Sequence, residues 1–368
     1  MANKKIGILT FHNADNYGAL LQAYALKYCL KQQGNKADII NYYCPKIQND
    51  YKLFFPFSFS KKWLKTKLKR FLFFPVMLYI RSKFRPFRKQ YLLDTEPLYP
   101  DTVASMADNY DIFISGSDQV FNTRITDFDT NYFLAFSKNK NKNFSYAASF
   151  GLQWSHLTDK EKLFFKEQFD NFAEFSVREQ QGADIIRYIS GRDCQINLDP
   201  ALLLTKDKWA QIAAPVKQQG YVLLYLMYKD SALIRFAKKL AKAKGLKVLF
   251  ISLLADFKNR VPAQHITPTP QQWLGLFLNA DYVVTNSFHG FAFSVNLNKT
   301  FFLGRLPEKL PVNSRLDNLL ALTGLEGRLY TNFKNDSDYD IPTDWQSVNE
   351  KLDKERQKAL DYLKDITK

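Results

Sequence analysis

The sequence contains few cysteines and none of the patterns that cysteines form when they hold a fold together. Only Cys29, Cys44 and Cys194 occur among the 368 residues. Their wide and irregular spacing provides neither a disulfide framework nor the paired Cys or Cys/His motif of a zinc site. We therefore expect a protein of a reducing compartment whose fold depends on hydrophobic cores, with no metal.

Long hydrophobic runs are also missing. No apolar run approaches the roughly 18–20 residues that a transmembrane helix needs, so no segment is expected to span a membrane. The apolar run at residues 6–11 is short and soon interrupted by polar residues, unlike the central region of a signal peptide. These absences predict a cytoplasmic chain.

Several catalytic signatures are absent as well. The sequence has no GxxxxGK[ST] phosphate-binding loop, and no GxGxxG follows its first predicted strand. These absences argue against a nucleoside triphosphatase and a standard dinucleotide enzyme. The chain also lacks the HExxH motif of zinc enzymes and the GxSxG elbow of serine hydrolases. We expect neither a metal nor a resident cofactor.

What the sequence has in excess is positive charge, and one segment holds most of it. Residues 51–93 contain twelve Lys or Arg and no Asp or Glu, which accounts for +12 of the net +16. Aromatic residues such as Trp63, Phe73 and Tyr79 are interleaved with these charges. That combination favours an anionic membrane surface, where rings lie at headgroup level and Lys and Arg meet lipid charges. A solvated helical insertion or a nucleic-acid surface would use the same residues; we favour the membrane and expect no nucleic acid.

The rest of the sequence alternates between apolar runs and amphipathic segments. Runs typical of buried parallel strands occur at residues 5–11, 36–43, 221–228 and 280–285. This alternation predicts an α/β fold of two Rossmann-like, doubly wound domains. Residues 1–210 would form the first, with the basic-aromatic insertion at 51–93, and residues 211–368 the second, with a C-terminal helix at 344–366. Ligands are expected at the carboxyl ends of the strands, in the cleft between the domains.

Three amphipathic segments are preceded by a capping-box pattern, which marks the start of a helix. The pairs are Thr158 with Glu161, Thr269 with Gln272, and Thr343 with Gln346. We therefore expect a helix to begin after each of the three threonines.

His289 occupies a position at which folds of this type bind anions. It follows the strand at 280–285 and lies in the first turn of a predicted helix, with Ser287 as the N-cap. A helix N-terminus offers free N–H groups and partial positive charge to a phosphate or carboxylate. Gly290 would let a ligand approach the backbone closely. His289 is thus a candidate general acid or base, although the same residues also suit a plain helix start.

Polar loops follow two other predicted strands. His12, Asn13 and Asn16 lie after the first strand, and Asp118 lies in a Gly-Ser-Asp turn after a later one. Their place at the carboxyl edge of a sheet favours ligand contact. Asp118 could act as a base or accept hydrogen bonds from ligand hydroxyl groups. Asn, Asp and Gly also form turns, so a purely connecting role stays open for these loops.

Six segments, in this order, resemble the bacterial polysaccharide pyruvyl transferase family: KIGILTFHNADNYGALLQAYAL, GSDQVFN, SYAASFG, FSVREQQG, LDPALLL and ADYVVTNSFHGFAFS. The resemblance extends from Lys5 to about Arg328. It implies two domains of the glycosyltransferase-B type and phosphoenolpyruvate as co-substrate, with no nucleotide sugar and no metal. Members usually form a cyclic pyruvate ketal on a hexose of a cell-surface glycan.

The resemblance also implies roles for individual residues. Arg178 is expected to hold the phosphate or carboxylate of the donor, and His289 to be the active-site histidine. A second basic residue should touch the donor, and either Arg305 or Arg315 could fill that role. The expected donor-binding residues are Arg178, Ser287, Gly290, Arg305 and Arg315, the catalytic residues His289 and Asp118, and the acceptor-binding residues His12, Asn13 and Asn16.

Glycan precursors of this kind are built on lipid carriers at the cytoplasmic face of a membrane. The resemblance therefore implies a peripheral protein at the inner face of the cell membrane, with a free or lipid-linked sugar as acceptor. Two alternatives stay open, a nucleotide-sugar glycosyltransferase of the same architecture and a non-catalytic, membrane-associated glycan-binding protein. Ser287 leaves room for the latter, because better-known members carry a basic residue two positions before the histidine.

Overall fold

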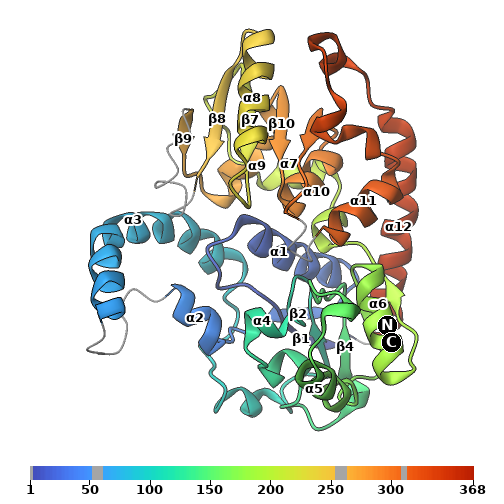
Figure 1. The fold of residues 1–368 in the computed structure, drawn as a ribbon. Coiled ribbons are helices and arrows are strands. Elements are labelled where there is room, and N and C mark those ends of the chain that lie inside the picture. The colour runs from blue at the N-terminus through green and yellow to red at the C-terminus, as the bar shows by residue number, and fades with distance from the viewer. Residues whose placement is uncertain (1–2, 52–60, 253–262, 308–312) are drawn as a thin grey trace.

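The computed structural model describes residues 3–51, 61–252, 263–307 and 313–368. They form two larger sheets, of order β2-β1-β3-β4 and β11-β10-β7-β8-β9, and a third of β5 and β6 alone (Figure 1). Every pairing within these sheets is parallel. The predicted α/β fold with two Rossmann-like units is confirmed. We call the parts that carry the two larger sheets the N-terminal half and the C-terminal half.

The strands are apolar because both faces of each larger sheet are covered. In β1, Ile6 and Ile8 face one hydrophobic cluster and Leu9 faces another, so alternate residues are buried on opposite sides. The strands of the N-terminal half are β1 (Lys5–Leu9), β2 (Lys36–Ile39), β3 (Ile112–Ser115), β4 (Asn143–Ser145), β5 (Ser176–Val177) and β6 (Gln195–Ile196). Those of the C-terminal half are β7 (Tyr221–Tyr225), β8 (Lys247–Ile251), β9 (Gln264–Ile266), β10 (Tyr282–Thr285) and β11 (Phe301–Leu303).

The helices follow the predicted alternation with the strands. Those that precede β7 are α1 (Tyr17–Gln32), α2 (Pro45–Tyr51), α3 (Lys61–Tyr91), α4 (Thr123–Thr126), α5 (Asp159–Phe169), α6 (Gln180–Ser190) and α7 (Lys206–Ile212). The later ones are α8 (Ser231–Ala243), α9 (Pro270–Asn279), α10 (Phe288–Asn296), α11 (Ser314–Thr323) and α12 (Trp345–Asp365). The predicted boundary at residue 210 falls within α7.

Two of the three predicted capping boxes are confirmed. Those at Thr158 and Thr269 are complete, with reciprocal hydrogen bonds at the starts of α5 and α9. The third prediction is wrong, because Asp344 rather than Thr343 caps α12 and accepts a hydrogen bond from the Ser347 N–H. A carboxylate one residue further on competes successfully with the threonine hydroxyl for the free N–H groups of the first turn.

The two halves are joined by buried contacts as well as by the chain. In α1, Tyr17 donates a hydrogen bond to the Pro268 carbonyl at 2.8 Å, and its ring stacks on Trp273 of α9 with 5.8 Å between centroids. Helix α12 returns from the C-terminal half, and its Tyr362 hydroxyl donates to the Ser145 carbonyl in β4 at 3.0 Å. The carboxyl ends of β1 and β10 therefore face the same interface.

The basic-aromatic segment includes α3, which is bent and reaches beyond the body of the N-terminal half (Figure 1). It contains Pro75 and Pro86, a residue type that interrupts helical hydrogen bonding. Phe84 and Phe87 bury it against the core, whereas Tyr79 is 50% exposed. The predicted insertion also covers residues 52–60, which lie outside the described residues. Across the described ranges, no helix combines the length and the apolar character that crossing a membrane requires.

Candidate functional site

The turn from β10 into α10 presents the N-terminus of a helix to the interface between the halves. Ser287 is the N-cap, as predicted, and its hydroxyl accepts a hydrogen bond from the Gly290 N–H at 3.3 Å. A Cβ atom on Gly290 would lie 2.4 Å from Thr285 Oγ1 and 2.9 Å from the Tyr225 ring. Glycine is therefore required here because α10 packs closely on its own sheet, which fixes the direction of the helix.

His289 lies where the two halves meet. Its side chain is buried, and a Cβ atom on Gly18, in the first turn of α1, would lie only 2.1 Å from His289 Nδ1. Gly18 thus makes room for the imidazole of the opposite half. His289 Nε2 has no hydrogen-bond partner and lies 3.7 Å from Asp199 Oδ2, longer than a hydrogen bond. The imidazole therefore carries one buried nitrogen that has no hydrogen-bond partner and lies beside a carboxylate.

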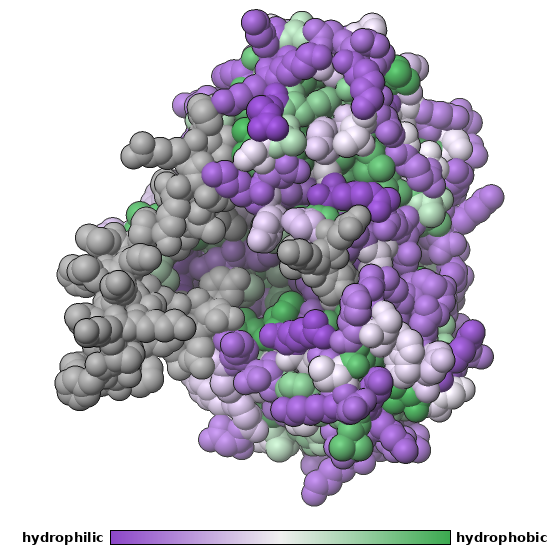
Figure 2. Space-filling view, viewed as in Figure 1, coloured by the Kyte–Doolittle hydropathy of each residue, from purple (hydrophilic) through white to green (hydrophobic). Residues whose placement is uncertain are grey.

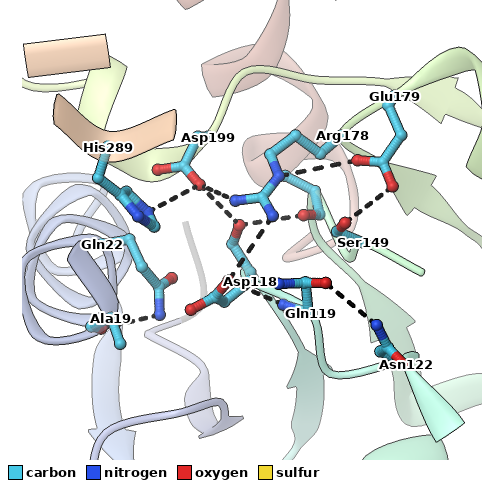
Figure 3. A network of polar contacts seen from close by, with 12 residues as sticks. Ala19, Gln22, Asp118, Gln119, Asn122, Ser149, Arg178, Glu179, Asp199 and His289 are labelled. Carbon is cyan, nitrogen blue, oxygen red and sulfur yellow. Dashed lines mark hydrogen bonds and ion pairs between the residues drawn. The ribbon is translucent and has the colours of Figure 1, made fainter. Parts of the chain in front are cut away.

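Asp199 joins the histidine to Arg178 (Figure 3). Its Oδ2 accepts a hydrogen bond from Arg178 Nη1 at 2.5 Å, and its Oδ1 accepts one from the Ala201 N–H at 2.9 Å. Burial alone would raise the pKa of the Asp199 carboxyl, but the facing imidazole of His289 and the Arg178 guanidinium together hold that pKa well below its usual range. Asp199 is therefore a buried carboxylate that orients two of the predicted site residues.

Arg178 is surrounded by negative charge. Besides Asp199, its guanidinium lies 3.6 Å from Asp118 Oδ1 and 3.8 Å from Glu179 Oε2, and its side chain is only 3% exposed. Glu179 Oε1 in turn accepts a hydrogen bond from the Ser149 hydroxyl at 2.8 Å. Three carboxylates thus hold one guanidinium, although Arg178 Nε and Nη2 make no hydrogen bond. Arg178, the residue predicted to bind the donor, is therefore buried, and three neighbouring carboxylates offset most of its positive charge.

Asp118 has an unusual backbone for a residue with a side chain. Its φ of 68° lies in the left-handed region that favours glycine, and its carboxylate accepts a hydrogen bond from the Gln119 N–H at 2.9 Å. Such conformations persist where the surroundings force them and are frequent at functional sites. The predicted catalytic residues Asp118 and His289 are both brought to this cluster.

Arg315 of α11 differs sharply from Arg178. It is 9% exposed, yet in the part of the chain that the structure describes it makes no hydrogen bond or ion pair, and its Nε is buried without a partner. Its guanidinium lies 5.7 Å from the Phe288 ring, and Arg178 stacks on the same ring at 4.7 Å. Burial, aided by the nearby charge of Arg178, lowers the pKa of Arg315 to about 10. The carboxylates of Glu179, Asp118 and Asp199 oppose this shift only in part. A buried cation that forms no ion pair is a suitable receptor for an anion.

Of the two arginines that sequence reasoning could not choose between, only Arg315 reaches the cluster. Arg305 is about half exposed and pairs with Asp317 at 2.8 Å. It does not line the cavity described below, so the structure separates the two candidates.

A cavity of about 790 Å³ opens between the two halves. Figure 2 shows that the molecule is hollowed there, with apolar and hydrophilic residues side by side. The walls combine residues from both halves, among them Asn16, Asp118, Gln119, Asn122, Arg124, Met227, Tyr228, Ser287, Phe288, His289 and Arg315. Its size is typical of a small-molecule site.

Two predicted acceptor residues lie apart from this cavity. His12 is 1% exposed, and its ring nitrogens bond to the Thr10 carbonyl at 3.1 Å and to Asn41 Oδ1 at 3.0 Å. Asn13 Nδ2 joins the same network. Asn16 does line the cavity, but its side chain also caps α1. The loop after β1 is thus largely occupied with its own hydrogen bonds.

Sequence reasoning missed Asp199 and Glu179 as members of the cluster. Both follow very short strands, β6 and β5, so no strong periodicity marked them as strand ends. For Asp199, one signal was available in the sequence. It lies in an Asp-Pro pair after an apolar run, and such a pair often begins a turn. Among the described residues, no group of three or more His, Cys, Asp or Glu side chains is arranged to hold a metal ion.

The sequence profile of the polysaccharide pyruvyl transferase family matches residues 16–303. The chain belongs to this family. Membership, predicted from six segments, is thereby confirmed, and the matched range of the pyruvyl transferase profile includes Asp118, Arg178, Asp199 and His289 but ends before Arg315.

No curated protein matches the sequence of this pyruvyl transferase family member. Among solved structures, it is similar to a putative UDP-N-acetylglucosamine 2-epimerase from Listeria monocytogenes, with 11% identity, a TM-score of 0.49, and coverage of 97% of this chain and 91% of that chain. The UDP-GlcNAc 2-epimerase from Neisseria meningitidis gives 9% identity, a TM-score of 0.46, and coverage of 95% and 100%. The wall teichoic acid polymerase TagF gives 12% identity, a TM-score of 0.43, and coverage of 98% and 82%.

Proposed function

We propose that this family member transfers the pyruvyl group of phosphoenolpyruvate to a hexose of a cell-surface polysaccharide or its lipid-linked precursor. The products would be a pyruvate ketal and phosphate. The observation that carries the proposal is Arg315, a buried guanidinium that forms no ion pair with a described residue. It lies on the wall of a cavity that also contains the N-terminus of α10. Both features attract an anion, and phosphoenolpyruvate carries a phosphate and a carboxylate.

The charges around Arg178 and Arg315 indicate which of the two would bind the phosphate of the donor. Asp118, Glu179 and Asp199 surround Arg178, so this guanidinium has little charge left to offer. Arg315 forms no ion pair with a described residue, so more of its charge remains for a ligand. We therefore assign the phosphate of the donor to Arg315 and the first turn of α10, with Arg178 as a more distant contribution.

The proposed chemistry requires three proton transfers, and His289 is our candidate for the first two. A proton is added to the methylene carbon of phosphoenolpyruvate, and a sugar hydroxyl attacks C2, giving up its own proton. The C2–O bond to phosphate then breaks as a second hydroxyl of the same sugar attacks C2, and its proton leaves with the phosphate. His289 Nε2 has no hydrogen-bond partner and is the candidate to donate the first proton and accept the second. The carboxylate of Asp199 lies 3.7 Å from this nitrogen.

The proposal is tested by incubating the purified protein with phosphoenolpyruvate and a panel of free and lipid-linked hexoses, while phosphate release is measured. Acceptor-dependent release supports the transferase. No release, together with no change in thermal stability on adding phosphoenolpyruvate, would contradict it. A thermal shift with UDP-sugars but not with phosphoenolpyruvate would favour the glycosyltransferase alternative.

We also propose that the basic-aromatic segment, which includes α3, holds the protein at an anionic membrane surface, at the inner face of the cell membrane. The support is the +12 charge of residues 51–93 and the position of α3, which extends beyond the body of the N-terminal half (Figure 1). Replacing the six Lys and Arg of residues 61–70 by Gln should abolish sedimentation with phosphatidylglycerol vesicles. Replacing six exposed lysines on α8 and α12 is the matched control and should leave sedimentation intact. Equal binding by both variants would contradict the proposal.

A further inference from the structure

The loop that follows β7 places two large apolar side chains at the mouth of the cavity. Met227 and Tyr228 both line the cavity, and they are 49% and 53% exposed. Exposed apolar side chains at the rim of a cavity mark a binding surface more often than single ones elsewhere on a protein. These two side chains lie opposite the polar groups of the N-terminal half. They are not part of the proposed donor site.

This loop is fixed by one buried side chain. Asn286 is 1% exposed, and its Oδ1 accepts hydrogen bonds from the N–H groups of Met227 at 2.8 Å and Tyr228 at 3.4 Å. Its Nδ2 donates to the Tyr228 carbonyl at 2.8 Å. Because Asn286 directly precedes the N-cap of α10, the backbone of Tyr228 is held in a constant position relative to His289. A fixed backbone under an exposed ring is the arrangement of a preformed binding platform.

Polar groups of the N-terminal half form another wall of the same cavity. Asp118 and Gln119 both line it, and Gln119 Oε1 accepts a hydrogen bond from Asn122 Nδ2 at 3.1 Å. A Cβ atom on Gly151, whose φ is 55°, would lie 2.0 Å from Gln119 Oε1, so this glycine makes room for the carboxamide. Within the described ranges, Gln119 Nε2 has no protein partner and remains free to donate.

We infer that Tyr228, Asp118 and Gln119 form the subsite for the acceptor sugar, and that it takes a neutral hexopyranose. The inference rests on the proposed function. A pyranose ring carries C–H bonds on one face, which suit the Tyr228 ring, and hydroxyl groups around its edge, which suit carboxylate and carboxamide partners. The carboxylate of Asp118 favours hydroxyl donors and disfavours a sugar that carries its own negative charge. The subsite thus spans both halves and lies beside His289.

Saturation-transfer NMR tests the subsite directly, because it needs no turnover. The probes are the methyl pyranosides of glucose, galactose and mannose, with methyl glucuronide as the charged counterpart. With the wild-type protein, and with inorganic phosphate added to occupy Arg315, saturation should reach ring protons of at least one neutral glycoside, and methyl glucuronide should bind more weakly. Tyr228→Ala should weaken glycoside binding about tenfold, whereas Tyr228→Phe should keep it, because the ring face carries the contact.

Tyr188 provides the matched control. It lies on α6, is 69% exposed and does not line the cavity, so Tyr188→Ala should bind glycosides like the wild type. No glycoside binding by the wild type, or equal binding by Tyr228→Ala, would overturn the inference. So would binding of uridine in place of the glycosides with the same dependence on Tyr228, since the ring would then serve a nucleotide.

The same samples separate this inference from the proposed function. Phosphoenolpyruvate should raise the thermal stability of Tyr228→Ala as it does that of the wild type, because Arg315 is unchanged. Glycoside binding through Tyr228 without any effect of phosphoenolpyruvate would refute the proposed donor and leave the sugar subsite standing. An effect of phosphoenolpyruvate without glycoside binding would refute the subsite alone.

Discussion

Replacing Arg315 by methionine is expected to make the empty protein more stable while removing its response to the donor. Methionine keeps the unbranched aliphatic part of the side chain, but it lacks the guanidinium that lies 5.7 Å from the Phe288 ring and carries no charge. The pKa of Arg315 falls from its ordinary 12.5 to about 10 in the folded protein. At about 1.4 kcal/mol per pKa unit, holding this charge in the fold costs about 3 kcal/mol at neutral pH. Arg315→Met should recover much of that free energy of unfolding.

Arg178 is the matched control, since it is equally buried but surrounded by carboxylates. Arg178→Met leaves Asp199 and its neighbours without a counter-charge and should destabilise the protein by about 3–5 kcal/mol. The assay is urea unfolding at pH 7, followed by circular dichroism, with and without phosphoenolpyruvate. The wild type should be stabilised by phosphoenolpyruvate, and Arg315→Met should not respond.

The pH dependence of the free energy of unfolding gives a further check on the direction of the pKa shift of Arg315. Because the pKa of Arg315 is depressed in the folded state, its cost is present below about pH 10 and disappears as the pH rises toward the ordinary value. The stability advantage of Arg315→Met should therefore shrink above pH 10. If Arg315→Met were destabilised as much as Arg178→Met, the reasoning would be refuted. Arg315 would then have a structural role, with a carboxylate partner in the protein in solution.

Three other substitutions test the cluster. His289→Ala should lower turnover by about 10²–10⁴ with an unchanged circular dichroism spectrum, and near-normal turnover would exclude its role as proton carrier. Gly18→Ala should displace the imidazole and lower turnover by about 10², whereas Gly327→Ala, where a Cβ meets nothing within 4 Å, should have no effect. Asp199→Asn should be less stable by about 3–5 kcal/mol at pH 7. Because the pKa of Asp199 is depressed, its stabilisation is present above about pH 4 and lost in acid, so this difference should narrow toward pH 3; a constant difference in urea unfolding would contradict the assignment.

The sequence predicted the fold well because most strands of the two larger sheets are continuous apolar runs with both faces buried. Helix starts were predicted equally well where one side chain dominates, as at Ser287 and Thr158, and less well at α12, where Asp344 and Thr343 compete. These features depend on neighbours in the sequence, which periodicity and capping patterns report directly.

The site was predicted only in part, because its decisive features depend on contacts between distant segments. His289, Asp118 and Arg315 were identified as candidates, and the structure brings them to one cavity. Nothing in the sequence distinguishes Arg315 from Arg305, since only the fold shows which of them lacks a carboxylate. His12 looked equivalent to His289 by position, but Asn41, 29 residues further along the chain, occupies its ring.

The contact between Gly18 and His289 makes the relative position of the two halves part of the proposed active site. The histidine belongs to one half, and the space that it fills belongs to the other. A rotation that separates the halves would leave the imidazole exposed to water and withdraw Asp118 from the residues that follow β10. Admission of a substrate by such an opening would disassemble the proton-transfer machinery, and closure would rebuild it. Phosphoenolpyruvate would then meet a competent histidine only in the closed molecule, which limits wasteful hydrolysis of the donor by bulk water.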